Sequence, residues 1–263
     1  MENELNFDTD WVDEFSGNPQ STKIFSGVST LEKGVKKILE LSDQSQEKLI
    51  RMLDEIKEIY GHSIVIYNPG VKSYESALRK AKNETGKPNQ ILRLNDGYRA
   101  SIICKNYEDI RHILIVVDGL LPKYNFNRLS VLNTFSNPWP NGYRDYNCRI
   151  EDLDNFDLVG ELQIHFCPIK LFSQTVGHLS YEILRTLKEE DPCTQKVRDA
   201  LQTIASAGYD SALNLEDDYC FAKIDKLEKQ RKVSTKKGGR FFCKKTRKVC
   251  NAKIKYKKNK KNK

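Results

Sequence analysis

The segment 158–166 limits the possible folds of this chain most strongly, because its side chains alternate between polar and apolar. From the first polar member onward the order is Glu161, Leu162, Gln163, Ile164, His165 and Phe166. Successive side chains of a strand point to opposite faces, so the segment has one apolar face and one polar face. The pattern predicts a β-strand whose polar face is either a plain solvent-facing surface or a functional site.

Helical and extended patterns interleave along the rest of the chain. Helices are predicted at 29–59, 71–81, 107–120, 169–189 and 195–207, with a further candidate at 215–233, and strands at 100–104, 128–135 and 143–150. The stretch 43–45 leaves open whether the first helix is divided in two. The segments 143–150 and 158–166 resemble a β-hairpin, which favours a mixed sheet flanked by helices, an α+β fold, over a purely parallel sheet.

Charge divides the chain into two parts. No acidic residue follows Glu228, and 17 of the 44 Lys and Arg residues lie at 229–263. The preceding part is therefore acidic, and the basic segment is predicted to be a disordered tail. Such a polycation attracts nucleic acid through counterion release. An anionic membrane, a nuclear import receptor or no specific partner at all are the alternatives.

The chain shows no apolar run long enough to cross a bilayer, and its first residues lack the basic-then-apolar order of a signal peptide. We therefore expect a cytoplasmic location. The seven cysteines are scattered and odd in number, and no pair has the spacing of a zinc knuckle. The sequence thus predicts neither a disulfide framework nor a cysteine metal site.

Two polar groups precede the predicted strand at 100–104. The first recurs at helical intervals, as Lys72, Ser76, Arg79 and Lys80. A row of cations on one helical face can hold a polyphosphate, although taken alone it fits an ordinary solvated face better. The second is Asp96, next to Gly97, where a carboxylate at the edge of a strand is well placed to bind Mg²⁺. A turn aspartate explains this residue equally well.

A third polar group is the turn Asn141-Gly142-Tyr143, which Arg144 follows. An aromatic ring beside a turn can stack on a nucleobase. For this residue in isolation, a tyrosine packed into the protein is the better explanation.

In their order along the chain, these groups resemble the RelA/SpoT synthetase family, whose members make the alarmone (p)ppGpp. That family has a Lys/Ser/Arg-bearing helix, a Mg²⁺-binding Asp, an Asn-Gly-Tyr turn and a Glu-x-Gln-Ile strand. This chain matches them at 72–80, Asp96, 141–143 and 161–164, and 178–182 is similar to a His-x-x-Tyr-Glu pattern of divergent members. The resemblance covers about 60–190 and implies a nucleotidyltransferase-like fold.

The resemblance also implies a magnesium-dependent transfer of pyrophosphate from ATP to the 3′-hydroxyl of GDP or GTP. Asp96 and Glu161 would be the catalytic carboxylates that hold Mg²⁺. The ATP-binding residues would be Lys72, Ser76, Arg79, Lys80 and Arg99. The acceptor-binding residues would be Asn141, Tyr143, Arg144, Gln163 and His165. The implied division of the chain is a polar lead-in at 1–28, a helical segment at 29–60, the synthetase-like domain at 61–190, C-terminal helices at 191–228 and the basic tail at 229–263.

The chain departs from the family around the acceptor turn. Trp139 stands where many members have Lys, and Arg144 begins a Arg-Asp-Tyr-Asn run where many have Gln-Ser-Leu-His. Arg144 is then the candidate for the acceptor's phosphates. Two other functions stay open: a toxin-type member that pyrophosphorylates the 3′ end of tRNA, which Trp139 and the tail favour somewhat, and a catalytically silent nucleotide- or RNA-binding protein. The retained Asp96 and Glu161 argue against the last. A homo-oligomer is also left open.

Overall fold

The computed structural model describes residues 20, 22–27, 30–83, 94–186, 192–215 and 223–224. The predicted tail at 229–263, most of the lead-in at 1–28 and nearly all of the candidate helix at 215–233 lie outside the described residues. Contacts divide the chain into two units, 1–221 and 222–263, and all helices and strands named below belong to the first.

A five-stranded mixed sheet forms the centre of the fold, in the order β1-β2-β5-β4-β3. The strands are β1 Ile64–Tyr67, β2 Arg99–Cys104, β3 Phe126–Asn133, β4 Tyr146–Asp152 and β5 Leu158–Phe166. β2 and β5 run parallel, and the other neighbouring pairs run antiparallel. The predicted mixed sheet and its β4–β5 hairpin are confirmed. β1 is not predicted by the sequence pattern, because a run of four residues is too short to show alternation.

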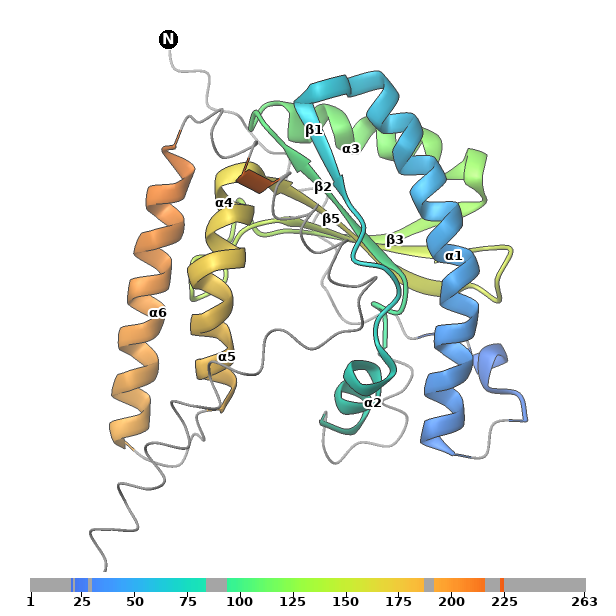
Figure 1. Cartoon of the computed structure of the whole chain (residues 1–263), viewed down its shortest axis with the longest axis horizontal. Coiled ribbons are helices and arrows are strands. Elements are labelled where there is room, and N and C mark those ends of the chain that lie inside the picture. Colours follow the sequence, from blue (N-terminus) through green and yellow to red (C-terminus); the bar gives the residue numbers. More distant parts are fainter. Residues whose placement is uncertain are drawn as a thin grey trace, which may run out of the picture. The chain divides into compact units, whose positions relative to one another are not determined.

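Helices cover both faces of this sheet (Figure 1). They are α1 Leu31–Tyr60, α2 Tyr74–Asn83, α3 Asp109–Leu120, α4 Cys167–Phe172, α5 His178–Thr186 and α6 Pro192–Leu213. α1 and α3 pack on one side, whereas α4, α5 and α6 stand on the other (Figure 1). A π-helical turn at Ser173–Gly177 joins α4 to α5, so the helix predicted at 169–189 is, up to residue 186, a continuous helical segment with one wider turn. Residues 187–189 lie outside the described residues. No helix in the described ranges is both long and apolar enough for a bilayer crossing.

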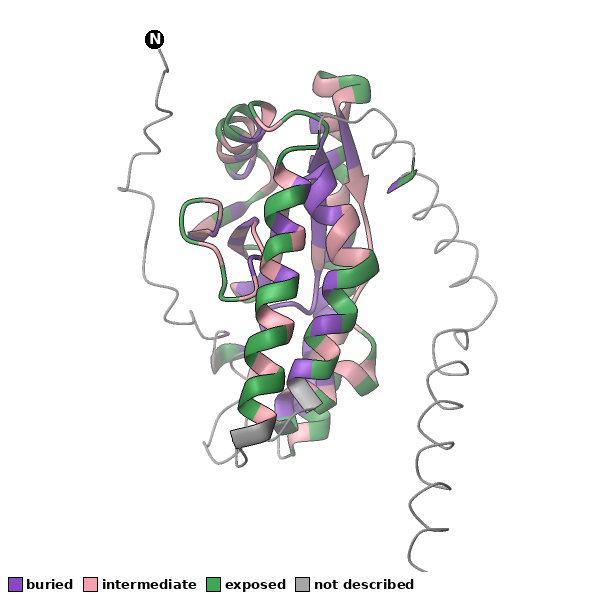
Figure 2. Cartoon of the chain, turned by 90° about the vertical axis from the view of Figure 1, so that its left-hand side faces the viewer, coloured by how far each residue is buried: buried purple, intermediate pink, exposed green. Residues whose placement is uncertain are grey.

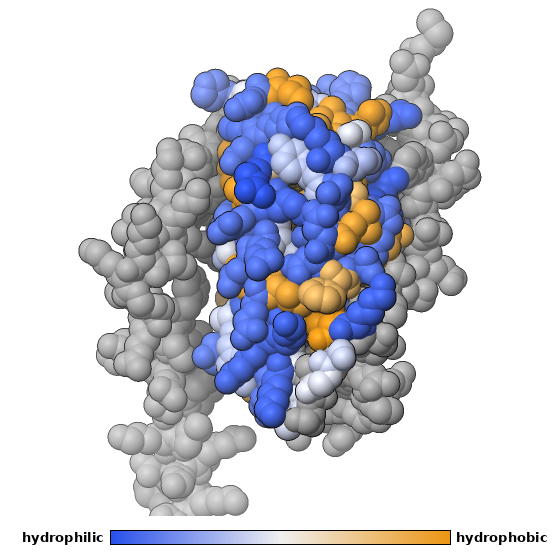
Figure 3. Space-filling model, turned by 90° about the vertical axis from the view of Figure 1, so that its right-hand side faces the viewer, coloured by the Kyte–Doolittle hydropathy of each residue, from blue (hydrophilic) through white to orange (hydrophobic). Residues whose placement is uncertain are grey.

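α1 is one helix of 30 residues, so the stretch 43–45 does not divide it. Thr30 caps its start, because the side-chain oxygen accepts a hydrogen bond from the amide of Lys33 at 3.3 Å. Ser42 and Ser45 are buried, and each hydroxyl donates to the carbonyl four residues earlier. The inward face is apolar, while the face that α1 turns outward is mainly hydrophilic (Figure 3).

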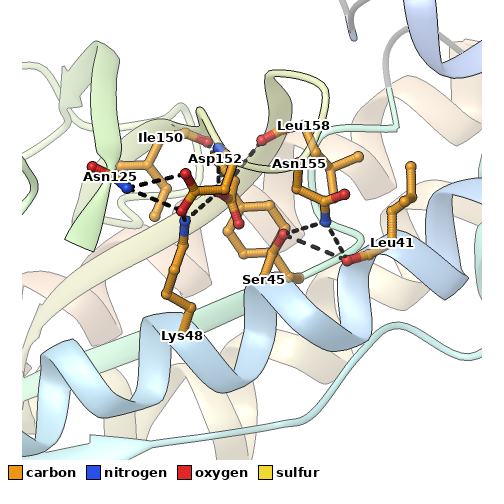
Figure 4. A network of polar contacts seen from close by, with 10 residues as sticks. Leu41, Ser45, Lys48, Asn125, Ile150, Asp152, Asn155 and Leu158 are labelled. Carbon is orange, nitrogen blue, oxygen red and sulfur yellow. Dashed lines mark hydrogen bonds and ion pairs between the residues drawn. The ribbon is translucent and has the colours of Figure 1, made fainter.

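Side chains of α1 also fix the turn between β4 and β5 (Figure 4). Asn155 in that turn donates its amide hydrogens to the Leu41 carbonyl at 2.7 Å and to Ser45 Oγ at 2.9 Å. Lys48 forms an ion pair with Asp152 at the end of β4. These contacts satisfy buried polar groups, and they hold the start of β5 at one position along α1.

Tyr98 occupies the space next to Gly160, near the start of β5. It is fully buried, and its hydroxyl donates to the carbonyls of Ile150 at 2.9 Å and Leu158 at 3.0 Å. A Cβ atom built on Gly160 would lie 2.3 Å from the Tyr98 ring. The ring therefore requires a glycine at 160, and it ties β2 to both strands of the β4–β5 hairpin.

We expect Gly160→Ala to lower the free energy of unfolding by about 1–3 kcal/mol, because the added methyl group overpacks a closed site. Urea unfolding followed by circular dichroism measures the change. Gly119→Ala is the matched control, since a Cβ there meets no atom within 4 Å. In α3 that substitution should leave stability unchanged or raise it by about 0.5–1 kcal/mol. Equal effects of the two substitutions would contradict the packing argument.

Candidate active site

The two candidate carboxylates lie at the same end of the adjacent strands β2 and β5. Arg99 at the start of β2 is the register partner of Glu161 in β5, and the Glu161 amide donates to the Tyr98 carbonyl at 3.2 Å. Asp96 stands three residues before Arg99, in the turn that leads into β2. The structure thus brings Asp96 and Glu161 to the same end of two adjacent parallel strands.

Arg149 of β4 connects these two positions, although the sequence argument does not select it. It is the register partner of Glu161 on the other side of β5. Its Nη1 atom donates to the carbonyl of Asn95, next to Asp96, at 3.0 Å, and lies 3.5 Å from Glu161 Oε1. Asn147 donates to the same Glu161 oxygen at 2.8 Å. Glu161 therefore has a fixed position between two side chains of β4.

Asp96 is buried and lies between two lysines. Lys72 Nζ is 2.6 Å from Asp96 Oδ2, and Lys80 Nζ is 3.2 Å from Oδ1. Burial by itself would raise the pKa of Asp96, but the charges of Lys80 and Lys72 and their hydrogen bonds outweigh it and hold the pKa at about 2. Burial lowers the pKa of Lys72, and the charge of Asp96 offsets only part of that effect.

The predicted cationic helix differs in one respect from the helix in the structure. α2 begins at Tyr74, so Lys72 precedes it, with its amide donating to the Gly97 carbonyl at 2.9 Å. Ser73 caps the start of the helix, because its side-chain oxygen accepts from the Ser76 amide at 3.3 Å. Lys72 nevertheless meets Lys80 at Asp96. Of the other two members, Ser76 is half-buried and Arg79 is exposed, and neither contacts Asp96 within the described residues.

Hydrogen bonds hold the backbone of Arg99, whereas one N–H group of its side chain has no acceptor among the described residues. Gln46 of α1 accepts from the Arg99 amide at 2.8 Å and donates to its carbonyl at 3.0 Å. The Arg99 Nε atom is buried and has no hydrogen-bond partner among the described residues. A buried guanidinium N–H without an acceptor is costly, so this atom is suited to an anionic ligand.

The polar face of β5 continues inward through two further residues. Gln163 Oε1 accepts from Ser101 at 3.4 Å and lies 3.2 Å from His165 Nε2. His165 is completely buried, and Lys170 Nζ lies 3.0 Å from the same ring nitrogen. Burial and then the Lys170 charge hold the pKa of His165 well below its usual value, so the ring is neutral.

The Asn-Gly-Tyr turn lies beside this inner part of the face. Asn141 Oδ1 accepts from the Tyr143 amide at 3.1 Å, and Gly142 takes a φ of +81° that suits glycine. The half-buried Tyr143 ring meets the rings of His165 and Tyr209 edge-on, with centroids 6.3 and 5.8 Å away. The structure therefore brings Tyr143 and His165 together, and both join Gln163 and Glu161 along one face of the sheet.

Asp145 is a buried carboxylate that sequence reasoning does not single out. It accepts from the Tyr143 hydroxyl at 3.0 Å and from Thr134 Oγ1 at 3.1 Å. Burial raises the pKa of Asp145 to about 7, and the charge of Glu161 adds to the rise, while the hydrogen bonds from Tyr143 and Thr134 oppose it. The Asp145 carboxyl thus positions Tyr143 through a hydrogen bond, and the carboxyl itself gains or loses its proton near pH 7.

The described residues contain no group of three or more His, Cys, Asp or Glu side chains placed to hold a metal. Mg²⁺ commonly uses only one or two carboxylates and takes its other oxygens from phosphates and water. Asp96 and Glu161 fit that smaller requirement.

Solved structures share this fold. No protein-family profile matches the chain, and no curated protein sequence matches it. The small alarmone synthetase 1 of Bacillus subtilis, bound to its product pppGpp, is 20% identical, with a TM-score of 0.52 over 74% of this chain and 96% of its own. A GTP pyrophosphokinase family protein of Streptococcus pneumoniae is 18% identical, with a TM-score of 0.53 over 77% and 98%.

The Type VI effector Tas1, solved with its immunity protein, is a third similar structure, 16% identical, with a TM-score of 0.52 over 71% of this chain and 100% of its own. At these identities the likeness concerns the fold. The predicted α+β fold and its resemblance to the RelA/SpoT-type alarmone synthetases are thereby confirmed. The chain has a pyrophosphokinase-type fold.

We expect Asp145→Asn to change the pH dependence of stability. The pKa of Asp145 is about 7 in the folded chain, whereas an unfolded chain gives the carboxyl its ordinary pKa of 3.8. The wild-type residue therefore costs increasing stability as pH rises from about 4 to about 7. Urea unfolding across that range should show the variant gaining on the wild type by about 1 kcal/mol per pH unit. A difference that does not vary with pH would refute the assignment.

Proposed function

We propose that this chain is a magnesium-dependent pyrophosphotransferase that moves the β,γ-pyrophosphate of ATP to the 3′-hydroxyl of GDP or GTP. The observation that supports this most is the position of Asp96 and Glu161 at the same end of β2 and β5, where Arg149 bridges Asn95 and Glu161 and where Lys72, Lys80 and Arg99 also lie. Two carboxylates next to several cations suit the transfer of a polyphosphate group.

The triphosphate of ATP lies, in this proposal, along the cations around Asp96. Lys72 and Lys80 already converge there, and the unpartnered Nε of Arg99 offers a further donor. Ser76 and Arg79 of α2 extend the same row. Such charges compensate the phosphates while the β-phosphorus is attacked, which lowers the barrier without any movement of the protein at that moment.

Asp96 and Glu161 are the residues that would hold Mg²⁺. Each Asp96 oxygen contacts one lysine and keeps a second lone pair with which it could ligate a cation. The two lysines would then stand beside the ion, within reach of the phosphate oxygens of ATP. When bound, the ion supplies charge compensation to the phosphate oxygens.

In the transfer step, the 3′-oxygen of the acceptor forms a bond to the β-phosphorus, and the bond from that phosphorus to the α–β bridging oxygen breaks. AMP leaves with the bridging oxygen. Glu161, fixed by Asn147 and Arg149, orients the hydroxyl and accepts its proton, and Gln163 next to it along the strand helps to hold the ribose. Tyr143 packs on the acceptor base, while Asn141 shapes the turn and Arg144 faces the acceptor's phosphates. The His165 ring packs edge-on against the Tyr143 ring and helps to hold it in place.

Replacement of either carboxylate tests the catalytic assignment. We expect Asp96→Asn and Glu161→Gln each to lower kcat for transfer from labelled ATP to GDP by at least about 100-fold. Unchanged circular dichroism spectra would show that the fold is intact. Glu58→Gln, on the exposed side of α1, is the control and should retain full activity. Retention of turnover in either site variant would refute the role of that carboxylate.

The alternative acceptor is the 3′ end of tRNA. Trp139 favours it, because its indole is 51% exposed directly beside the Asn141–Tyr143 turn and is available to stack on an unpaired base. Purified protein incubated with labelled ATP, Mg²⁺ and GDP, GTP or tRNA separates the candidates. We expect label on the guanosine nucleotides; label on tRNA alone supports the toxin-type function, and label on no acceptor supports the silent binding protein.

A further inference from the structure

α6 packs tightly against the helices next to the site. Ala205, Tyr209 and Ala212 form its buried side, and Figure 2 shows the exposed residues on the opposite side of the helix. A Cβ on Gly208 would lie 2.2 Å from the Phe172 ring, and one on Gly177 would lie 2.2 Å from the Tyr209 hydroxyl. These close approaches fix the position of α6 along the segment 167–186.

Three residues on one face of α6 meet the acceptor turn. Ser206 is so close to Gly142 that a Cβ there would lie 2.6 Å from the Ser206 Cα. The Tyr209 ring meets Tyr143, and Asp210 Oδ1 lies 2.7 Å from Arg144 Nη2. Ser206, Tyr209 and Asp210 follow the spacing of one helical face, so α6 contacts three consecutive residues of the turn.

The two partners of the ion pair differ in their surroundings. The Arg144 side chain is 12% exposed, and its Nη1 atom also donates to the Gly142 carbonyl at 3.0 Å. The Asp210 side chain is 55% exposed, so its carboxylate can turn into water, whereas Arg144 Nη2 then needs another acceptor. The guanidinium is therefore the fixed partner, and the carboxylate is the one that another anion can replace.

We propose that Asp210 is a specificity-determining residue, whose carboxylate occupies the anion position on Arg144 until a phosphate group of a guanosine nucleotide replaces it. This inference rests on the proposed function. A phosphate offers more charge and more acceptor oxygens than a carboxylate, and it can pair with both arms of the guanidinium. A nucleoside without phosphates cannot displace Asp210. The helix thereby selects phosphorylated acceptors.

Removal of the competing carboxylate should strengthen the binding of GDP. We expect Asp210→Asn to bind GDP about threefold to fivefold more tightly than the wild type in isothermal titration calorimetry, the range that a partly exposed ion pair accounts for. Guanosine, which has no phosphate, should bind both proteins equally. Asp199→Asn makes the same change of charge on an exposed part of α6 and should leave GDP affinity unchanged.

Arg144→Gln completes the test. In the Arg144→Gln background, the further change Asp210→Asn should have no effect on GDP affinity, because the shared cation is absent. Equal or weaker binding of GDP by Asp210→Asn, an equal gain in Asp199→Asn, or no GDP binding by any of the proteins would overturn the inference. Binding is measured without turnover, so tight GDP binding without transfer of label refutes the proposed reaction alone.

Discussion

The parallel pairing of β2 with β5 is the constraint on which the rest of this molecule depends. It places Arg99 opposite Glu161, and it places the turn that contains Asp96 at the same end of the sheet. A parallel pair needs a long crossover, and here the intervening chain supplies α3, β3 and β4. β4 then returns as the other neighbour of β5 and brings Arg149 and Asn147 to Glu161. Two carboxylates with fixed partners are the direct result.

The site combines negative charge with cations that are already in position. Lys72 and Lys80 meet at Asp96, whereas Arg149 stands next to Glu161. Burial makes each of these contacts stronger than it would be in water, and it also makes an unpaired charge costly. In the proposed function, these cations are the groups that would pair with the phosphates of ATP. The apolar face of the same sheet packs against α1 and α3, so a rigid core supports the polar face (Figure 1).

The turn at 142–144 depends on a helix that follows the motifs shared with the RelA/SpoT family. α6 packs against α4 and α5 and reaches the turn at 142–144 through one face. The family pattern ends near 190, so the contacts of Tyr209 and Asp210 belong to a part of the chain that the motifs do not cover.

The sequence alone determined the elements and the chemical character of their faces. The alternation at 161–166 and the hairpin-like pair at 143–166 led to the mixed sheet, because side-chain periodicity is a property of neighbouring residues. The roles expected for Asp96 and Glu161 came from the resemblance to the RelA/SpoT family. Only the tertiary structure decided which side chains these residues contact. Three examples arise between segments far apart in the chain: strand register places Arg149 beside Glu161, burial raises the pKa of Asp145, and Arg144 pairs with Asp210. No local pattern encodes such distances, since register and burial are set by the packing of the whole domain.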